Sequence, residues 1–244
     1  MISHTGIFLS ETLGTGIMIF LGLSTSMQGW FRRQGAAAGA AGWALAVFTG
    51  ASVADASGAH LNPAITLAQA LAGRVDWVDV PAYLAGEGTG TLVGAVLAAF
   101  VFHHDVLGER NNDHLVGLFA TLPLRPGHVR NVTTEALASG VLVAFVLCSP
   151  SASVHDGVYH FGNEGLGYAA VAMVIFVLTI GAGGPTSAAM NPFRDLGPRV
   201  VYTIIYRGSG MPSARWDYAW VPIAGPLIGS GLGVMASLLL SADG

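Results

Sequence analysis

The chain has 244 residues, of which 52% are apolar and only 10% are charged. A soluble domain carries about 25% charged residues, so these values exclude a water-soluble surface of this size. All the basic residues are Arg and the net charge is −4, with no basic run, which argues against nucleic acid as a partner. The single Cys148 excludes an internal disulfide and a Cys-based metal site.

Six stretches are long and apolar enough to span a bilayer of about 30 Å, which takes about 20 helical residues. In chain order they are Ile7–Met27, Gly35–Asp55, Pro81–Phe102, Val132–Ser149, Leu166–Ala182 and Tyr218–Leu240. Two further apolar stretches, Asn62–Leu71 and Asn191–Val201, are too short to span. They are predicted to be re-entrant, a form that survives at membrane depth only inside protein or beside a cavity. The polar connection from His103 to Asn131 is expected to lie in water.

The two halves of the chain carry similar features in the same order. Each half has a span with a Glu (Glu11 or Glu135), a second span, a short Asn-Pro stretch and a span with Gly at four-residue spacing. The spaced residues are Gly86, Gly90, Gly94, Gly225, Gly229 and Gly233. Because each half contains three spans, the second half is inverted. We therefore expect one membrane domain over residues 1–244, built from inverted repeats at about 6–103 and 131–241.

The Asn62-Pro63 and Asn191-Pro192 pairs predict two helix starts, since Asn caps helices and Pro suits the first helical position. Inside a membrane the positive ends of both helices oppose cations. Each Asn oxygen can cap its own helix and leave its NH₂ group to donate to a passing molecule. The preceding segments, 57–61 and 183–190, offer carbonyl acceptors. Such a path suits small neutral hydroxylated solutes.

Two segments, 57–64 and 190–199, resemble the signature loops of the aquaporin and glycerol-facilitator family, and the resemblance extends from Phe8 to Leu240. It implies an all-α fold of six spanning helices and two half-helices. It also implies a pore through each subunit, a homotetramer in the cell membrane, no cofactor and no enzymatic step. Exclusion of cations by half-helix ends is an established feature of such pores. Glu11 and Glu135 match the buried acids that hold the family's re-entrant loops.

The pore motifs of the family correspond here to Asn62, Pro63, Ala64, Asn191, Pro192 and Phe193. Phe193 stands where the family usually has Ala. We expect its ring to fill space between helices, with narrowing of the pore as the alternative. Four further residues resemble the glycerol-facilitator branch of the family, namely Asp195, Arg199, Pro222 and Ile223.

The selectivity filter is expected to contain Arg194, whose guanidinium donates to solutes in the outer constriction. Counting from the motifs gives Gly42 as a second filter residue, or Trp43 if the register shifts by one. The fifth span contributes Thr179, Ile180 or Gly181, depending on a gap near Pro185, with Thr179 and Gly181 preferred, and the loop contributes Ala188. This filter is open and resembles those of metalloid-permeable members.

The resemblance implies a passive channel for glycerol and water, with urea and metalloid acids as further candidate solutes and lipid around the protein. One alternative is a channel for neutral metalloid acids such as arsenite or silicic acid. Another is an ion-coupled secondary transporter, since inverted repeats with broken helices also serve transport. Only Asp55 and Glu87 are placed to bind a coupling ion. No metal site or catalytic constellation is expected.

The distribution of Arg conflicts with the membrane orientation that the resemblance implies. With both termini in the cytoplasm, only Arg74 lies clearly on that side, against the tendency of basic residues to stay inside. The residues then placed outside are Arg32, Arg33, Arg110, Arg125, Arg130, Arg207 and Arg215. We retain cytoplasmic termini because of the motif match.

Overall fold

The computed structural model describes residues 2–149, 166–207 and 209–241, and this part of the chain is helical without strands. Every predicted span and both short stretches correspond to a helix, and the polar connection adds α5 and η2. The elements are α1 (His4–Phe31), α2 (Ala36–Val53), η1 (Asp55–Ser57), α3 (Pro63–Leu71), α4 (Val80–Val101), α5 (His103–Gly108), η2 (Leu115–Leu118), α6 (His128–Cys148), α7 (Leu166–Ala182), α8 (Pro192–Ile205) and α9 (Val221–Ser241).

The helix ends differ from the predicted spans by a few residues. Helix α1 begins at His4, because the Ser3 side chain accepts from Gly6 N at 3.1 Å and caps the helix. Helix α6 begins at His128 and includes a polar first turn. Hydropathy marks where the apolar stretch begins, whereas a helix can continue through a polar turn into water.

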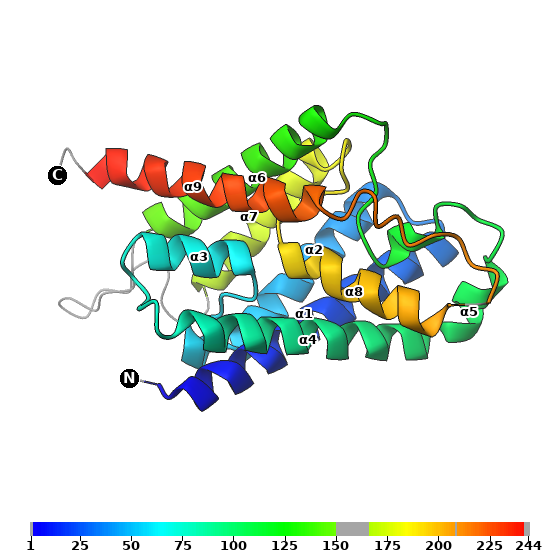
Figure 1. The fold of residues 1–244 in the computed structure, drawn as a ribbon, viewed down its shortest axis with the longest axis horizontal. Helices are drawn as coiled ribbons and strands as arrows, with labels where there is room; N and C mark the ends of the chain where they lie inside the picture. The colour runs from blue at the N-terminus through cyan, green and yellow to red at the C-terminus, as the bar shows by residue number, and fades with distance from the viewer. Residues whose placement is uncertain (1, 150–165, 208, 242–244) are drawn as a thin grey trace.

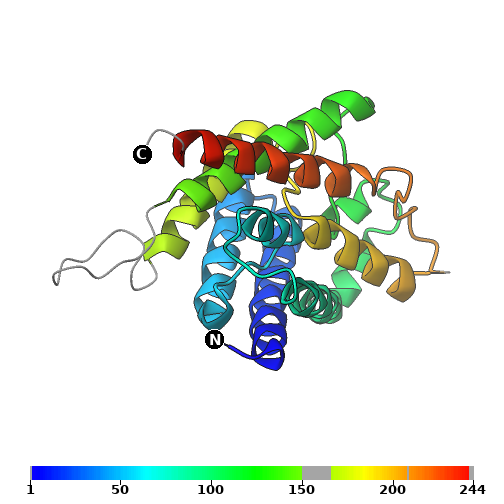
Figure 2. The same ribbon diagram turned by 60° about the vertical axis from the view of Figure 1, so that its left-hand side comes forward.

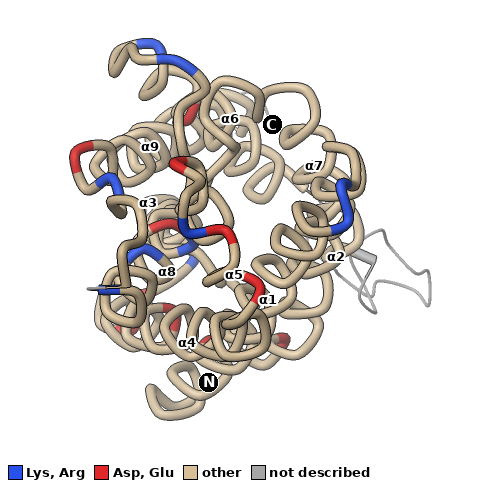
Figure 3. The backbone as a smooth tube through the Cα atoms, turned by 90° about the vertical axis from the view of Figure 1, so that its right-hand side faces the viewer, with Lys and Arg blue, Asp and Glu red and all other residues tan. Residues whose placement is uncertain are grey.

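Five helices have the length and apolar composition needed to cross a membrane, namely α1, α2, α4, α6 and α9. The sixth predicted span, α7, has 17 residues. Figure 3 looks onto the end of the molecule that carries α5, where charged residues gather in the turns around the rim while the spans are almost free of charge. The start of α1 and the end of α9 both lie at the other end of the molecule, on opposite sides of it (Figure 1).

The helices form two tightly packed pairs, α1 with α4 and α6 with α9, on either side of α3 and α8 (Figures 1 and 2). Glycine allows this close approach. A Cβ atom at Gly90 of α4 would lie 2.5 Å from the Thr12 carbonyl oxygen of α1, and one at Gly229 of α9 would lie 2.6 Å from the Ala136 oxygen of α6. At the spaced glycines the backbones of the paired helices therefore contact each other directly, with no side chain between them.

The connection between α4 and α6 is partly buried, so the prediction that all of it lies in water is wrong. Leu115, Val116 and Phe119 are at most 1% exposed. The Phe119 ring packs against Tyr202 of α8 and against Tyr206, the residue that follows α8, at centroid distances of 5.3 and 5.7 Å. Apolar residues within a polar connection therefore bring it back onto the bundle, where it covers α8.

Helices α3 and α8 lie end to end in the middle of the bundle (Figure 1). They come from opposite halves of the chain, and both begin with the Asn-Pro pair. This arrangement places the two helix N-termini at the centre of the molecule.

Candidate functional site: a central passage between two half-helices

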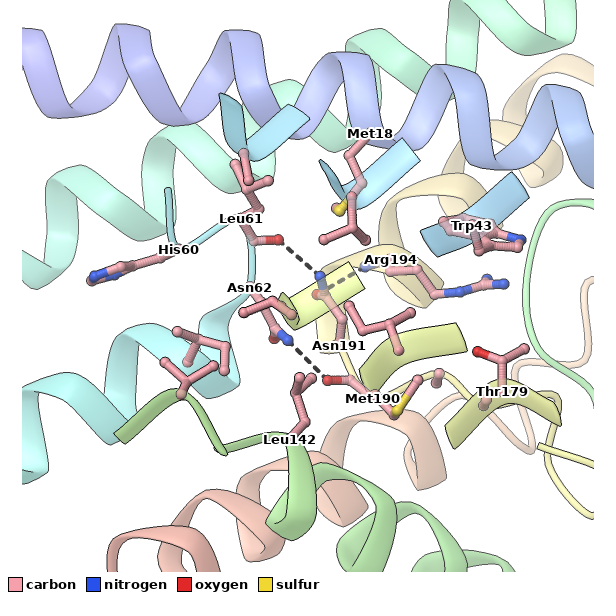
Figure 4. A pocket seen from close by; sticks show the side chains of 18 of the residues that line it. Met18, Trp43, His60, Leu61, Asn62, Leu142, Thr179, Met190, Asn191 and Arg194 are labelled. Atoms are coloured by element: carbon pink, nitrogen blue, oxygen red, sulfur yellow. Dashed lines mark hydrogen bonds between the residues drawn. The ribbon is translucent and has the colours of Figure 1, made fainter. Parts of the chain in front are cut away.

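The two Asn residues join the half-helices reciprocally. Asn62 Oδ1 accepts from Ala64 N at 3.0 Å, while its Nδ2 donates to the Met190 carbonyl at 2.9 Å. Asn191 Oδ1 accepts from Phe193 N at 3.0 Å, and its Nδ2 donates to the Leu61 carbonyl at 2.8 Å (Figure 4). The prediction left each NH₂ group wholly free. One of its two protons is instead used to tie the halves together, and one remains.

The segments before the half-helices are held by the two buried acids. Glu11 Oε1 accepts from His60 N at 3.0 Å and Oε2 from Leu61 N at 2.7 Å. Glu135 accepts in the same way from Ala189 N at 3.0 Å and Met190 N at 2.8 Å. Each carboxylate therefore satisfies two backbone N–H groups of an extended segment, which would otherwise be buried without partners.

Backbone conformation explains why these segments need such support. Leu61 and Met190 have φ angles of 54° and 50°, in the left-handed region that side chains other than glycine rarely adopt. The two carboxylates bind the N–H groups of these segments. The Leu61 and Met190 carbonyls instead accept from the Asn amides of the opposite half, at the centre of the molecule.

A cavity of about 270 Å³ runs past the junction of the two half-helices. Both halves of the chain line it (Figure 4), and its walls include the residues Asn62, Asn191, Trp43, Thr179, Ala188 and Arg194. Its remaining wall is largely apolar, with Met18, Val47, Leu142, Val146 and Ile175.

Of the two residues considered on α2, Trp43 lies on the cavity wall and Gly42 does not. A Cβ atom at Gly42 would run into Thr25 of α1, so this glycine serves the contact between α1 and α2. Of the three considered on α7, Thr179 lines the cavity, whereas Ile180 and Gly181 are exposed and outside its lining. The register of both spans is fixed by helix packing, which counting from a motif does not capture.

Arg194 and Trp43 form the most polar end of this cavity. The guanidinium Cζ lies 4.1 Å from the Trp43 ring centroid, a cation–π contact. The indole N–H of Trp43 donates to Ser26 Oγ at 2.9 Å, which fixes the ring. Arg194 lines the cavity, so its guanidinium places a positive charge beside the passage (Figure 4). Its Nη1 atom is buried and has no hydrogen-bond partner within the described chain.

The other motif residues shape the backbone without lining the cavity. Pro63 and Pro192 occupy the first helical positions of α3 and α8, and Ala64 is fully buried. The Phe193 ring lies toward α4, where a Cβ atom at Gly88 would be 3.5 Å from it, and Phe193 is absent from the cavity lining. Its carbonyl accepts from Thr91 Oγ1 at 2.8 Å.

Asp195 and Arg199 form a buried ion pair on α8, with side-chain exposures of 1% and 0%. Arg199 Nε donates to Asp195 Oδ1 at 2.8 Å and Nη2 to Oδ2 at 2.9 Å. The other two branch residues lie at the start of α9, where Pro222 is buried and Ile223 partly buried. None of these four residues belongs to the lining of the cavity.

The two acids considered for ion coupling have hydrogen-bond partners. Thr66 Oγ1 donates to Glu87 Oε1 at 2.6 Å and lies 2.9 Å from His60 Nδ1. Tyr168 OH donates to Asp55 Oδ1 at 2.7 Å. Sequence reasoning missed Tyr168 and the apolar cavity wall, because an apolar residue inside a span looks the same whether it faces lipid, a neighbour or a passage.

A helical membrane bundle with a passage between two opposed half-helices defines a membrane channel. The family model for the major intrinsic protein matches residues 2–237, and the chain belongs to this family of integral membrane proteins.

Similar proteins cover nearly the whole chain. The glycerol uptake facilitator protein of Bacillus subtilis (strain 168) is 35% identical over 242 residues, with 93% of this chain and 81% of that protein covered. Human aquaporin-9 is 30% identical, with 95% and 81% covered. Among solved structures, the aquaglyceroporin from Plasmodium falciparum matches with a TM-score of 0.80 at 27% identity, covering 96% of this chain and 95% of that one.

Proposed function

We propose that this protein is a passive channel for glycerol and other small neutral hydroxylated solutes, and for water. The observation that carries the proposal is the central cavity, whose largely apolar wall also contains the charged side chain of Arg194. Relatives named glycerol uptake facilitators and an aquaglyceroporin support the same solute class.

The polar groups along the passage suit molecules that both donate and accept hydrogen bonds. A solute hydroxyl oxygen would accept from the Arg194 guanidinium and then from the remaining amide protons of Asn62 and Asn191, while the hydroxyl proton would be donated to backbone carbonyls. The apolar wall takes up the carbon skeleton. Cations meet the Arg194 charge and the positive ends of α3 and α8. No chemical step is assigned, so we propose no enzymatic activity.

The narrow end in this proposal consists of Trp43, Thr179, Ala188 and Arg194. Ala188 is small, which leaves room beside the fixed Trp43 ring. This feature favours a second candidate class, neutral metalloid acids such as arsenite or silicic acid, together with urea. Trp43 and Thr179 replace Gly42 and Gly181 in the proposed filter because they lie on the cavity wall.

The proposed assembly is a homotetramer of one-domain subunits, each built from two inverted repeats. Large apolar side chains on the outside of the bundle support it, because they need lipid or a neighbouring copy to cover them. Phe100 of α4 is 81% exposed and Met173 of α7 is 69% exposed. Native mass spectrometry of the detergent-solubilised protein tests this proposal, and a monomer at all detergent concentrations would contradict it.

Stopped-flow light scattering on proteoliposomes tests the transport activity, with separate gradients of water, glycerol and arsenite. We expect a fast glycerol flux that rises linearly with glycerol concentration and does not change when a proton or sodium gradient is imposed. Flux that saturates and follows an ion gradient would instead indicate the coupled transporter, and Glu87→Gln would then abolish it. Water flux without glycerol flux would contradict the proposed solute class.

A further inference from the structure

The narrow end of the cavity is formed by two chain segments that do not follow one another. Arg194 stands in the first turn of α8, and Ala188 stands in the loop before it. The width between them depends on how these two segments are held. A four-residue coil, Thr121–Leu124, contacts both of them, and we refer to it below as the strap.

One end of the strap is hydrogen-bonded to Asp195, the residue that follows Arg194. Asp195 Oδ2 accepts from Thr121 N at 2.7 Å and from Thr121 Oγ1 at 2.6 Å. Arg199 Nη2 donates to the Thr121 carbonyl at 3.0 Å, so the buried ion pair holds all three polar groups of Thr121. This end is fully buried, since Thr121 is 1% exposed.

The other end of the strap is bonded next to Ala188. Ser187 Oγ donates to the Leu122 carbonyl at 3.0 Å, and Leu124 N donates to the Pro185 carbonyl at 3.0 Å. Two hydrogen bonds therefore connect the strap to the loop that carries Ala188.

This loop needs restraint from outside. Ser187 and Ala188 have φ angles of 66° and 48°. Non-glycine residues keep such conformations only where surrounding structure enforces them. Glu135 holds the loop at Ala189 and Met190, beyond Ala188, and the strap holds it at 185–187, before Ala188. If the hydrogen bonds at one of these two points were removed, the distance between Ala188 and Arg194 would vary over a wider range.

We propose that the strap sets the width of the narrow end and thereby the size range of linear polyols that pass, an inference that rests on the proposed function. Ser187 and Thr121 are positioning residues in this view, because they act through the segments that they hold. Ser187 also lies on the cavity wall, whereas Thr121 does not, so Thr121 gives the test that is free of a direct contact with solute. A loosened strap lets the opening fluctuate. Wider openings help large solutes more than small ones, so size discrimination falls.

Ser187→Ala is the test variant, because Ser187 is exposed and its loss removes one hydrogen bond. Ser52→Ala is the matched control, since Ser52 is also exposed and bonds only within its own helix, to the Phe48 carbonyl. Proteoliposomes are loaded with ethane-1,2-diol, glycerol or erythritol, and the permeabilities are measured beside that of water. We expect Ser187→Ala to raise the erythritol-to-glycerol ratio about three-fold, as one ordinary hydrogen bond would allow, and the control to leave it unchanged.

Thr121→Val probes the other end of the strap and is expected to shift the ratio in the same direction. If Ser187→Ala lowers all permeabilities by one factor, the hydroxyl serves only folding and the proposal is overturned. An unchanged ratio, or a shift confined to Ser187→Ala, overturns it as well. If the wild type passes water but no polyol, the proposed function is wrong, whatever the role of the strap. In that case the strap proposal predicts that Ser187→Ala makes the channel permeable to ethane-1,2-diol, and no permeability would overturn it.

Discussion

Replacing Arg199 by Met should lower the stability of the folded protein strongly for a change of one side chain. Arg199 is fully buried and donates to Asp195, to the Thr121 carbonyl and to the carbonyls of Ala214 and Arg215. Arg199→Met leaves three carbonyls without this donor. It also leaves the Asp195 carboxylate buried with only the two Thr121 donors.

Breaking a buried ion pair on one side costs about 3–5 kcal/mol, because the remaining charge is uncompensated. For a chain of this size each kcal/mol lowers the melting temperature by about 2–4 °C. Arg199→Met should therefore melt about 6–20 °C below the wild type. Asp195→Asn in the same chain removes the stranded charge and should recover part of that loss.

The measurement is the temperature at which half of the detergent-solubilised protein leaves its monodisperse chromatographic peak. A fixed heating protocol is needed, since the unfolding of such proteins is often irreversible. Arg199→Met within about 2 °C of the wild type, less than about 1 kcal/mol, would refute the reasoning. A double variant that melts below Arg199→Met would also refute it, because the stranded charge would then not be the cause.

Three further predictions concern the passage and its supports. Ala188→Phe should narrow the cavity end and lower erythritol permeability about fivefold or more relative to glycerol, given overpacking costs of about 1–3 kcal/mol. An erythritol-to-glycerol permeability ratio equal to that of the wild type in stopped-flow assays would contradict this prediction. Glu135→Gln turns an NH₂ group toward a buried backbone N–H, at about 1–3 kcal/mol, and should lower the melting temperature; an unchanged value would contradict the role of Glu135. Phe193→Ala should cost about 1–3 kcal/mol of packing and leave glycerol permeability per channel unchanged, whereas a clear rise would mean that the ring narrows the passage.

The helices and the opposed half-helices could be predicted from the sequence, because hydropathy and the Asn-Pro pairs are local signals. The role of Glu11 and Glu135 could also be predicted, because the family resemblance implies that these two acids hold the re-entrant segments. The order of the spans and the two short stretches followed from the repeat of these signals.

The filter register could not be predicted from local signals. Gly42 and Trp43 differ by one residue, or about 100° around the helix, and only the packing of Gly42 against Thr25 decides which faces inward. The fold-back of the connection was missed for a similar reason. Phe119 belongs to an apolar run at 115–120 inside the connection, but its partners Tyr202 and Tyr206 lie more than eighty residues further along the chain.

The reciprocal bonds of Asn62 and Asn191 have a consequence for how the chain folds during synthesis. Each amide seeks a carbonyl on the opposite half, 128 and 130 residues away in sequence. Chains are synthesised at roughly 5–20 residues per second, so Asn62 waits about 6–26 s for its partner. During that time the first three spans hold the half-helix α3 in the bilayer while the amide of Asn62 at its N-terminus lacks its carbonyl partner. We therefore expect the isolated first half to be unstable, and the membrane insertion machinery or lipid to shelter this end until the second half arrives.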